Sequence, residues 1–145
     1  MTLVSTAARR LKDLLPALSG LPGPVQAEFF IIYSTLKNLG VEMEHEEAAD
    51  NAKRAAFRRW LQRLRRLSRA HQGQPWAERM ARLIEPGDGS TVASIMAEIA
   101  ETGAPERVVG KIMEWTIGYL ADCNDAELSM FRENDRLSRH RATVV

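Results

Sequence analysis

Apolar residues recur at three- and four-residue spacing along most of the chain, the pattern of amphipathic helices. In the first predicted helix, residues 6–18, leucines stand at i, i+3, i+4 and i+7, and Pro16 should kink the helix or end it early. Strand-like alternation never exceeds a few residues, and no internal repeat is present. The pattern therefore predicts an all-α fold.

The second helix is predicted over residues 25–39, because Pro24 stands at its start and Gly40 just past its end. Further helices are predicted over residues 44–72, 75–85, 91–101 and 105–122 and from residue 124 onward, with Ser90 as a predicted N-cap. We expect one single-domain bundle of six or seven helices over residues 1–145, frayed at 1–5 and about 139–145.

Two of these helices are apolar on most sides and are expected at the centre of the bundle. In residues 25–39 the run Phe29–Tyr33 leaves little polar surface, which is typical of a central helix or of a subunit interface. Residues 105–122 are similarly apolar after Lys111.

The predicted helix 44–72 is a long, central, basic amphipathic helix with three longitudinal surfaces. On a helical wheel, one apolar stripe faces the core, formed by Phe57, Trp60, Leu61, Leu64 and Leu67. Beside it runs an edge strip of arginines, formed by Arg54, Arg58, Arg65 and Arg69. On the back lies a second row, the back strip, formed by Arg59, Arg63 and Arg66.

Charge is distributed unevenly although the formal net charge is only +1. Between Asn51 and Ala77 stand eight basic residues, seven of them arginine, and no Asp or Glu. The remainder of the chain carries 12 basic and 19 acidic residues, so a basic block lies in an acidic chain. This asymmetry bears on the kind of partner that the protein can bind.

The arginine-rich helix allows three interpretations. Its arginines can form a solvated face paired with acidic residues of this chain or of a neighbouring subunit. They can neutralise a phosphate backbone, and the preference for Arg over Lys favours bidentate contacts. Thirdly, the helix can bind a membrane surface or a calmodulin-like groove, which requires a free apolar stripe.

From these we predict a non-enzymatic protein that binds the nucleic-acid phosphate backbone without reading bases, as an oligomer or a small subunit of a larger assembly. Its binding residues would be the edge strip, with the back strip secondary. The alternative is a protein-interaction module whose edge strip docks on an acidic surface, such as residues 42–50 ("EMEHEEAAD") of a second copy. An enzyme or ligand-binding bundle, the third class, would need an enclosed cavity between apolar helices.

Other chemistry is weakly indicated. Glu42 and His45 form a Glu-x-x-His pair, but no second pair completes a di-iron set, and no metal, cofactor or catalytic residue is predicted. A turn at 87–90 could hold an anion, although an ordinary N-capped turn is preferred. Cys123 is the only cysteine, which fits a reducing compartment, and no run spans a bilayer, so a cytoplasmic location is expected.

Overall fold

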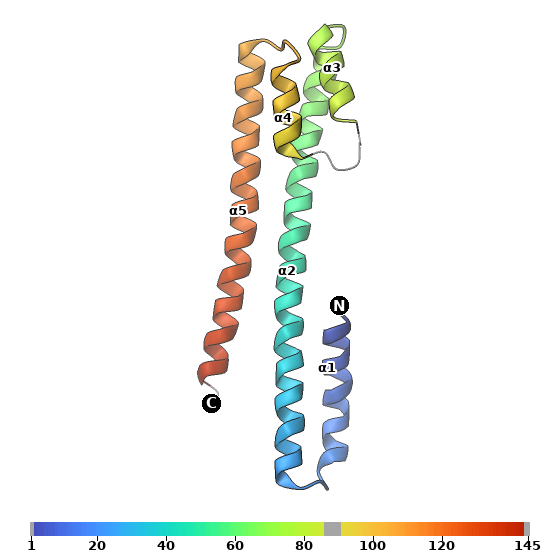
Figure 1. Cartoon of the computed structure of the whole chain (residues 1–145), viewed down its shortest axis with the longest axis vertical. Coiled ribbons are helices and arrows are strands. Elements are labelled where there is room, and N and C mark those ends of the chain that lie inside the picture. Colours follow the sequence, from blue (N-terminus) through green and yellow to red (C-terminus); the bar gives the residue numbers. More distant parts are fainter. Residues whose placement is uncertain (1, 86–90, 144–145) are drawn as a thin grey trace. The chain divides into compact units, whose positions relative to one another are not determined.

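The computed structural model describes residues 2–85 and 91–143, and within them every regular element is helical (Figure 1). In chain order the elements are α1 (Leu3–Leu14), the 3₁₀ helix η1 (Leu15–Leu18), α2 (Gly23–Ala70), α3 (Pro75–Leu83), α4 (Val92–Ala100) and α5 (Glu106–Thr143). The all-α prediction is confirmed. The described residues form five α-helices, so the expected number of six or seven is wrong.

Two predicted helix breaks are absent. The helices expected over 25–39 and 44–72 are one helix of 48 residues, and the two expected on either side of residue 123 are one helix of 38. A Gly ends a helix when it adopts positive φ. Among the described residues, Gly73 and Gly103 do so, at 98° and 78°, whereas Gly40 stays helical.

The first predicted helix is interrupted at Pro16, as its sequence predicts. The α-helical part of the first helix stops at Leu14 and gives way to η1, whose second residue is Pro16. The start lies three residues earlier than expected, because the Thr2 hydroxyl accepts a hydrogen bond from the Ser5 backbone N–H and caps α1. The N-cap predicted at Ser90 lies outside the described residues.

The contacts divide the chain into two compact units, and the boundaries fall inside α2 and α5. We call them the terminal unit, Met1–Asn51 with Glu127–Val145, and the middle unit, Ala52–Ala126.

The middle unit contains an apolar core contributed by all of its helices. Its fully buried side chains include Trp60 and Leu64 of α2, and around them lie Trp76, Ala77, Met80, Ile84, Ile95, Ile99, Val108 and Ile112. The indole N–H of Trp60 donates to the Thr116 hydroxyl at 3.1 Å, so the buried nitrogen is satisfied. The apolar stripe predicted on the basic helix does pack on this core.

The terminal unit is held together by a close helix–helix approach and by polar contacts. α1 lies alongside the first part of α2 (Figure 1), and a Cβ added at the buried Gly40 would stand 2.7 Å from Ser5 Oγ. Ser5 Oγ also donates to Glu44 at 2.7 Å, and Arg141 of α5 pairs with Glu42 at 2.7 Å. Gly40 therefore permits close helix packing, which differs from the helix-ending role expected of it.

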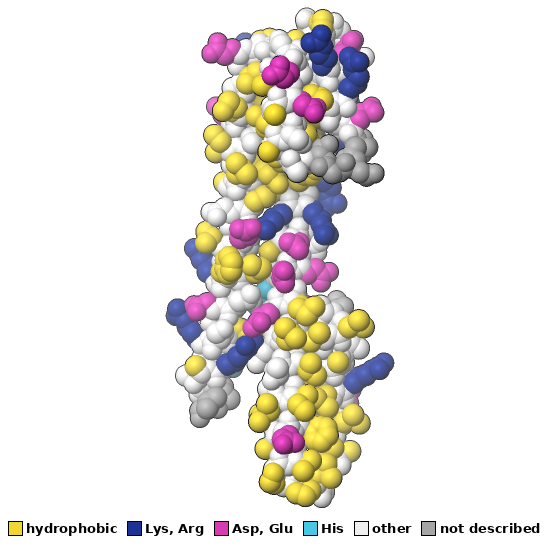
Figure 2. Space-filling model, viewed as in Figure 1, with side chains coloured by type: hydrophobic (Ala, Val, Ile, Leu, Met, Phe, Trp, Pro, Cys, Tyr) yellow, Lys and Arg dark blue, Asp and Glu magenta, His cyan; other side chains and the backbone are white. Residues whose placement is uncertain are grey.

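Hydrophobic side chains gather on the surface over α1 and the first part of α2 (Figure 2). Among the described residues of the terminal unit, the buried hydrophobic ones are Ala8 and Ala49. Eight larger ones on these two helices and their connection are exposed, namely Leu3, Leu14, Leu21, Phe30, Ile31, Ile32, Leu39 and Met43. The helix expected at the centre of a bundle therefore shows much of its apolar surface to solvent.

The second helix expected at the centre, residues 105–122, is buried in one part and exposed in another. Val108 and Ile112 at its start are buried in the core, whereas Met113, Ile117 and Leu120 are exposed. Within the described ranges, no helix combines the length and the apolar character needed to cross a bilayer.

Candidate functional site

The arginines of the middle unit lie on the stretch of α2 between Ala52 and Ala70, whose orientation is fixed by burial of Trp60 and Leu64. Arg54, Arg58 and Arg69 of the edge strip are exposed, and all three residues of the back strip are exposed as well. Arg65 is half-buried because its guanidinium Nη2 lies 3.5 Å from the carbonyl of Ile84, at the end of α3. Six of the seven predicted arginines are thus open to solvent.

Acidic residues cover little of this surface. Within the described part of the chain, the ion pair made by these arginines joins Arg59 of the back strip to Asp122 at 3.6 Å, between two largely exposed side chains. Such a pair contributes little stability. Within the described residues, no carboxylate is seen in an ion pair with an arginine of the edge strip.

Arg54 and Arg58 are brought together in a groove of about 720 Å³ in the middle unit. α2 contributes Lys53, Arg54, Phe57 and Arg58, the start of α4 contributes Thr91, Val92 and Ala93, and α5 contributes Tyr119 and Leu120. Arg65 and Arg69 do not line it. The groove combines a basic wall from one helix with an apolar wall from the others.

The start of α4 adds a favourable field to the groove. Thr91 forms a capping box with Ser94: the Ser94 backbone N–H donates to Thr91 Oγ1 at 3.1 Å, and the Thr91 N–H donates to Ser94 Oγ at 3.0 Å. The positive end of the helix dipole therefore lies on the same groove as two guanidinium groups. The combined field favours an anionic ligand.

The apolar wall is built around Tyr119. Its ring packs edge-on against Phe57, with centroids 6.1 Å apart, and lies 6.2 Å from the Trp60 ring. Burial raises the pKa of Tyr119 from 10.0 to about 12, and the hydrogen bond and charge of Cys123 act in the same direction. Tyr119 is therefore a neutral phenol at physiological pH.

The back strip borders a smaller hollow of about 220 Å³, also within the middle unit. Arg59 and Arg63 line it together with the rings of Trp60, Trp115 and Tyr119 and with Asp122. The Asp122 carboxylate makes this hollow less favourable for an anion than the groove. The two strips of arginine therefore differ in their surroundings.

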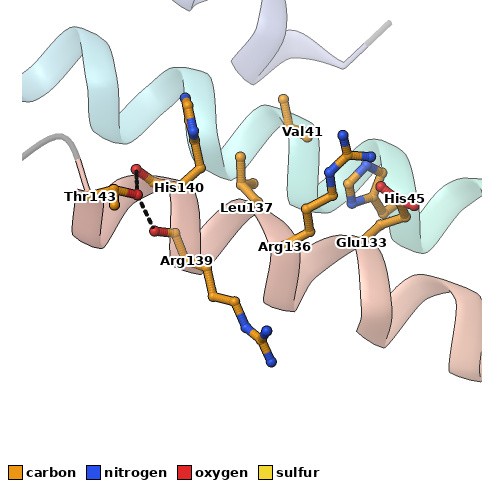
Figure 3. Close-up of a pocket in the computed structure, with 8 residues that line it drawn as sticks. All are labelled: Val41, His45, Glu133, Arg136, Leu137, Arg139, His140 and Thr143. Atoms are coloured by element: carbon orange, nitrogen blue, oxygen red, sulfur yellow. Dashed lines mark hydrogen bonds between the residues drawn. The ribbon is translucent and has the colours of Figure 1, made fainter.

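The terminal unit has its own concave surface of about 660 Å³ between α2 and α5 (Figure 3). Arg136, Glu133 and His45 lie together at one end of it, whereas Arg139 points away from α2 (Figure 3). His45 Nδ1 lies 2.7 Å from Asn134 Oδ1, so this ring is already engaged. Sequence reasoning missed this surface, since its two sides are separated by about ninety residues.

Metal-ligand geometry is not formed around the Glu-x-x-His pair. The Glu42 carboxylate accepts a hydrogen bond from Arg141, and the His45 ring contacts the side-chain oxygen of Asn134. Among the described residues, no group of three or more His, Cys, Asp or Glu side chains comes close enough together to hold a metal ion. Trp76 of α3 is buried against the core, and its ring centroid lies 5.0 Å from that of His71.

The fold and the groove lined by Arg54 and Arg58 define an all-helical protein with an arginine-lined helix. Comparison of the chain with known protein families, with curated proteins and with solved structures finds no match.

Proposed function

We propose that this protein binds the phosphate backbone of nucleic acid through the edge strip, and that it does so as an oligomer or as a subunit of a larger assembly. The edge strip is Arg54, Arg58, Arg65 and Arg69. Binding is electrostatic and independent of base sequence, and the back strip extends it. No catalytic role is part of this proposal.

One observation supports the proposal above all: the edge strip is a row of guanidinium groups on a helix fixed by a packed core, with no carboxylate of the described residues paired to it. From Arg54 to Arg69 the helix rises about 22 Å. That length matches roughly six steps of a nucleic-acid strand at about 3.4 Å each. Cationic side chains that neutralise phosphates release the counterions condensed on the nucleic acid.

The groove supports this proposal for the first two arginines of the edge strip. Arg54 and Arg58 stand one helical turn apart, opposite the capped start of α4. A phosphate placed there receives bidentate contacts from arginine and the favourable end of the α4 dipole. The proposal therefore assigns the largest share of binding to Arg54 and Arg58.

The test is fluorescence anisotropy of labelled duplex DNA and of labelled RNA over a series of salt concentrations. The logarithm of the binding constant should fall linearly with the logarithm of salt. Replacing Arg54 and Arg58 together by Ala should reduce the steepness of that line by about 2, or about one per phosphate contact.

The matched control is Arg9→Ala with Arg10→Ala, two neighbouring exposed arginines of α1 in the terminal unit. This pair should leave the salt dependence unchanged. The proposal is overturned by absence of binding to both nucleic acids in low salt, or by equal losses in the two double variants.

A second candidate function is docking of the edge strip on an acidic protein surface, including residues 42–50 of a second copy. Glu46, Glu47 and Asp50 of the acidic segment are exposed and available to such a partner. This function predicts a dimer that dissociates as salt rises, whereas the phosphate proposal requires no such dimer.

A further inference from the structure

The first part of the terminal unit is a helical hairpin with an unusual distribution of apolar residues. We define the hairpin as α1, η1 and residues 23–43 of α2. Its eight larger exposed hydrophobic residues contrast with the two alanines that are buried among the described residues of the terminal unit. Helices of this length owe most of their stability to packing of an apolar face, and here that packing is incomplete within one chain.

We infer that a second copy of this chain covers the hairpin, so that two hairpins pack together as a symmetric helical bundle. In such a dimer each copy presents the same surface, and the axis between them is two-fold. Two antiparallel helices from each copy supply the four helices of a bundle with a shared core. This inference does not depend on phosphate binding.

The size of the apolar surface fits a second copy. The eight exposed Leu, Ile, Phe and Met side chains each leave roughly 100 Å² in contact with water, or about 800 Å² in all, spread over more than one face of α2. A stable interface of standard size takes about 800 Å² from each partner and is about two-thirds apolar in homodimers, so about 500 Å² of this apolar surface is enough for one interface.

The shape of the hairpin is also suited to self-association. An open apolar hollow of about 500 Å³ lies at its closed end, lined by Leu15, Leu18, Ala27 and Phe30 with Gly23 and Gln26. Ile31 stands next to Phe30 and is 62% exposed. A surface that carries both a protruding side chain and an apolar hollow is able to interlock with its own copy.

Charge distinguishes a second copy from a lipid surface. Between Leu14 and Leu36 the sequence contains a single charged residue, Glu28, so two copies meet there with little like-charge repulsion. The terminal unit as a whole has eight basic and ten acidic residues. Helices that bind anionic membranes have an excess of Lys and Arg, which this unit lacks.

The test is the mass of the full chain in solution, measured by size-exclusion chromatography with light scattering at low and at high salt. We expect twice the mass of one chain under both conditions, since apolar burial is not screened by salt. Ile31→Glu should raise the dissociation constant of the dimer at least tenfold, because the dimer buries one unpaired carboxylate from each copy.

Ile117→Glu is the matched control, because Ile117 is 65% exposed on α5 but belongs to the middle unit. It should leave the dimer intact, and circular dichroism should show unchanged helix content in both variants. Ile31→Cys in a Cys123→Ser background gives a second readout, a disulfide-linked dimer under mild oxidation.

Four results would overturn the inference. They are a monomeric wild-type chain, equal dissociation by Ile31→Glu and Ile117→Glu, loss of the dimer at high salt, and binding of the monomer to vesicles of neutral or anionic lipid. A salt-sensitive dimer would instead favour pairing of the edge strip with an acidic segment. The nucleic-acid titrations are separate, so failure of either proposal leaves the other measurable.

Discussion

At Gly40 the lack of a side chain allows the backbone of α1 to approach α2. A Cβ there would lie 2.7 Å from Ser5 Oγ and 3.3 Å from the Ser5 Cα and backbone nitrogen. The first distance is shorter than a normal contact, and Ser5 is held by its bond to Glu44. The two helices would have to move apart to admit even one methyl group.

Gly40→Ala is therefore predicted to destabilise the protein by about 1–3 kcal/mol, although Ala is the better helix former. Gly110→Ala in α5 is the control, because a Cβ at that position meets nothing within 4 Å. It should stabilise the protein by about 0.5–1 kcal/mol. Urea unfolding measures both changes, and stabilisation by both variants would contradict the close approach.

Tyr119 supplies a prediction about pH. Burial, with the hydrogen bond and charge of Cys123, raises the pKa of Tyr119 from 10.0 to about 12 in the folded state. A raised pKa means that the folded protein holds the proton more tightly than the unfolded chain. This contribution to stability is complete below pH 10 and is lost as the pH rises from about 10 through about 12.

The difference in tyrosinate absorbance between the wild type and Tyr119→Phe should show a midpoint near pH 12. Cys123→Ala should lower that midpoint, because it removes the hydrogen bond and the charge of Cys123. A midpoint near 10 in the wild type would show that the phenol is not desolvated.

At the scale of the elements, α4 depends on its cap. It has nine residues, too few to be stable by helix propensity alone, and its first turn is closed by the Thr91–Ser94 capping box. Thr91→Ala should reduce the free energy of unfolding by about 1 kcal/mol, whereas Thr91→Ser retains the hydroxyl and should cost much less. Thermal unfolding compares the two, and equal losses would assign the effect to the lost methyl group.

Helical periodicity predicted the type of every element but not where the long helices continue. Gly40 and the acidic run after it suggested one helix ending and another starting. Nothing in a single sequence distinguishes a Gly that ends a helix from one that admits a neighbouring helix, because the difference lies in the contact with Ser5. Residues 122–125 were similarly polar, yet α5 runs through them.

The arginine groove could likewise be predicted only in part from the sequence. The wheel of α2 correctly separated the core stripe from the two strips, because helix geometry fixes those positions locally. Thr91 and Tyr119 could not be assigned to the groove, since they reach Arg54 and Arg58 only through tertiary packing. For residues 25–39 the sequence left two places open, the centre of a bundle or a subunit interface, because an apolar helix has the same pattern whether it is buried or unpartnered.

At the scale of the whole molecule, we expect the terminal unit to have a lower local stability than the middle unit. The large buried side chains of the described residues lie in the middle unit, and the terminal unit buries two alanines. Local opening is easiest where few apolar contacts are lost. At high dilution, amides of α1 and of residues 23–39 should exchange with deuterium faster than those of residues 60–68 and 108–112.

Raising the protein concentration should slow exchange in the hairpin alone, because a second copy supplies the missing contacts. Hydrogen exchange followed by mass spectrometry measures both effects. Equal protection of the two units in dilute protein would contradict this distribution of stability.

Cys123 has a practical consequence that follows from its place in α5. It is the only cysteine of the chain, it is half-buried, and it lies one helical turn after Tyr119, which lines the groove with Arg54 and Arg58. A maleimide dye or a nitroxide attached to this thiol labels the natural sequence at one position. Its emission or spectral width then reports whether the groove is occupied, so the protein carries an intrinsic attachment point for a ligand sensor.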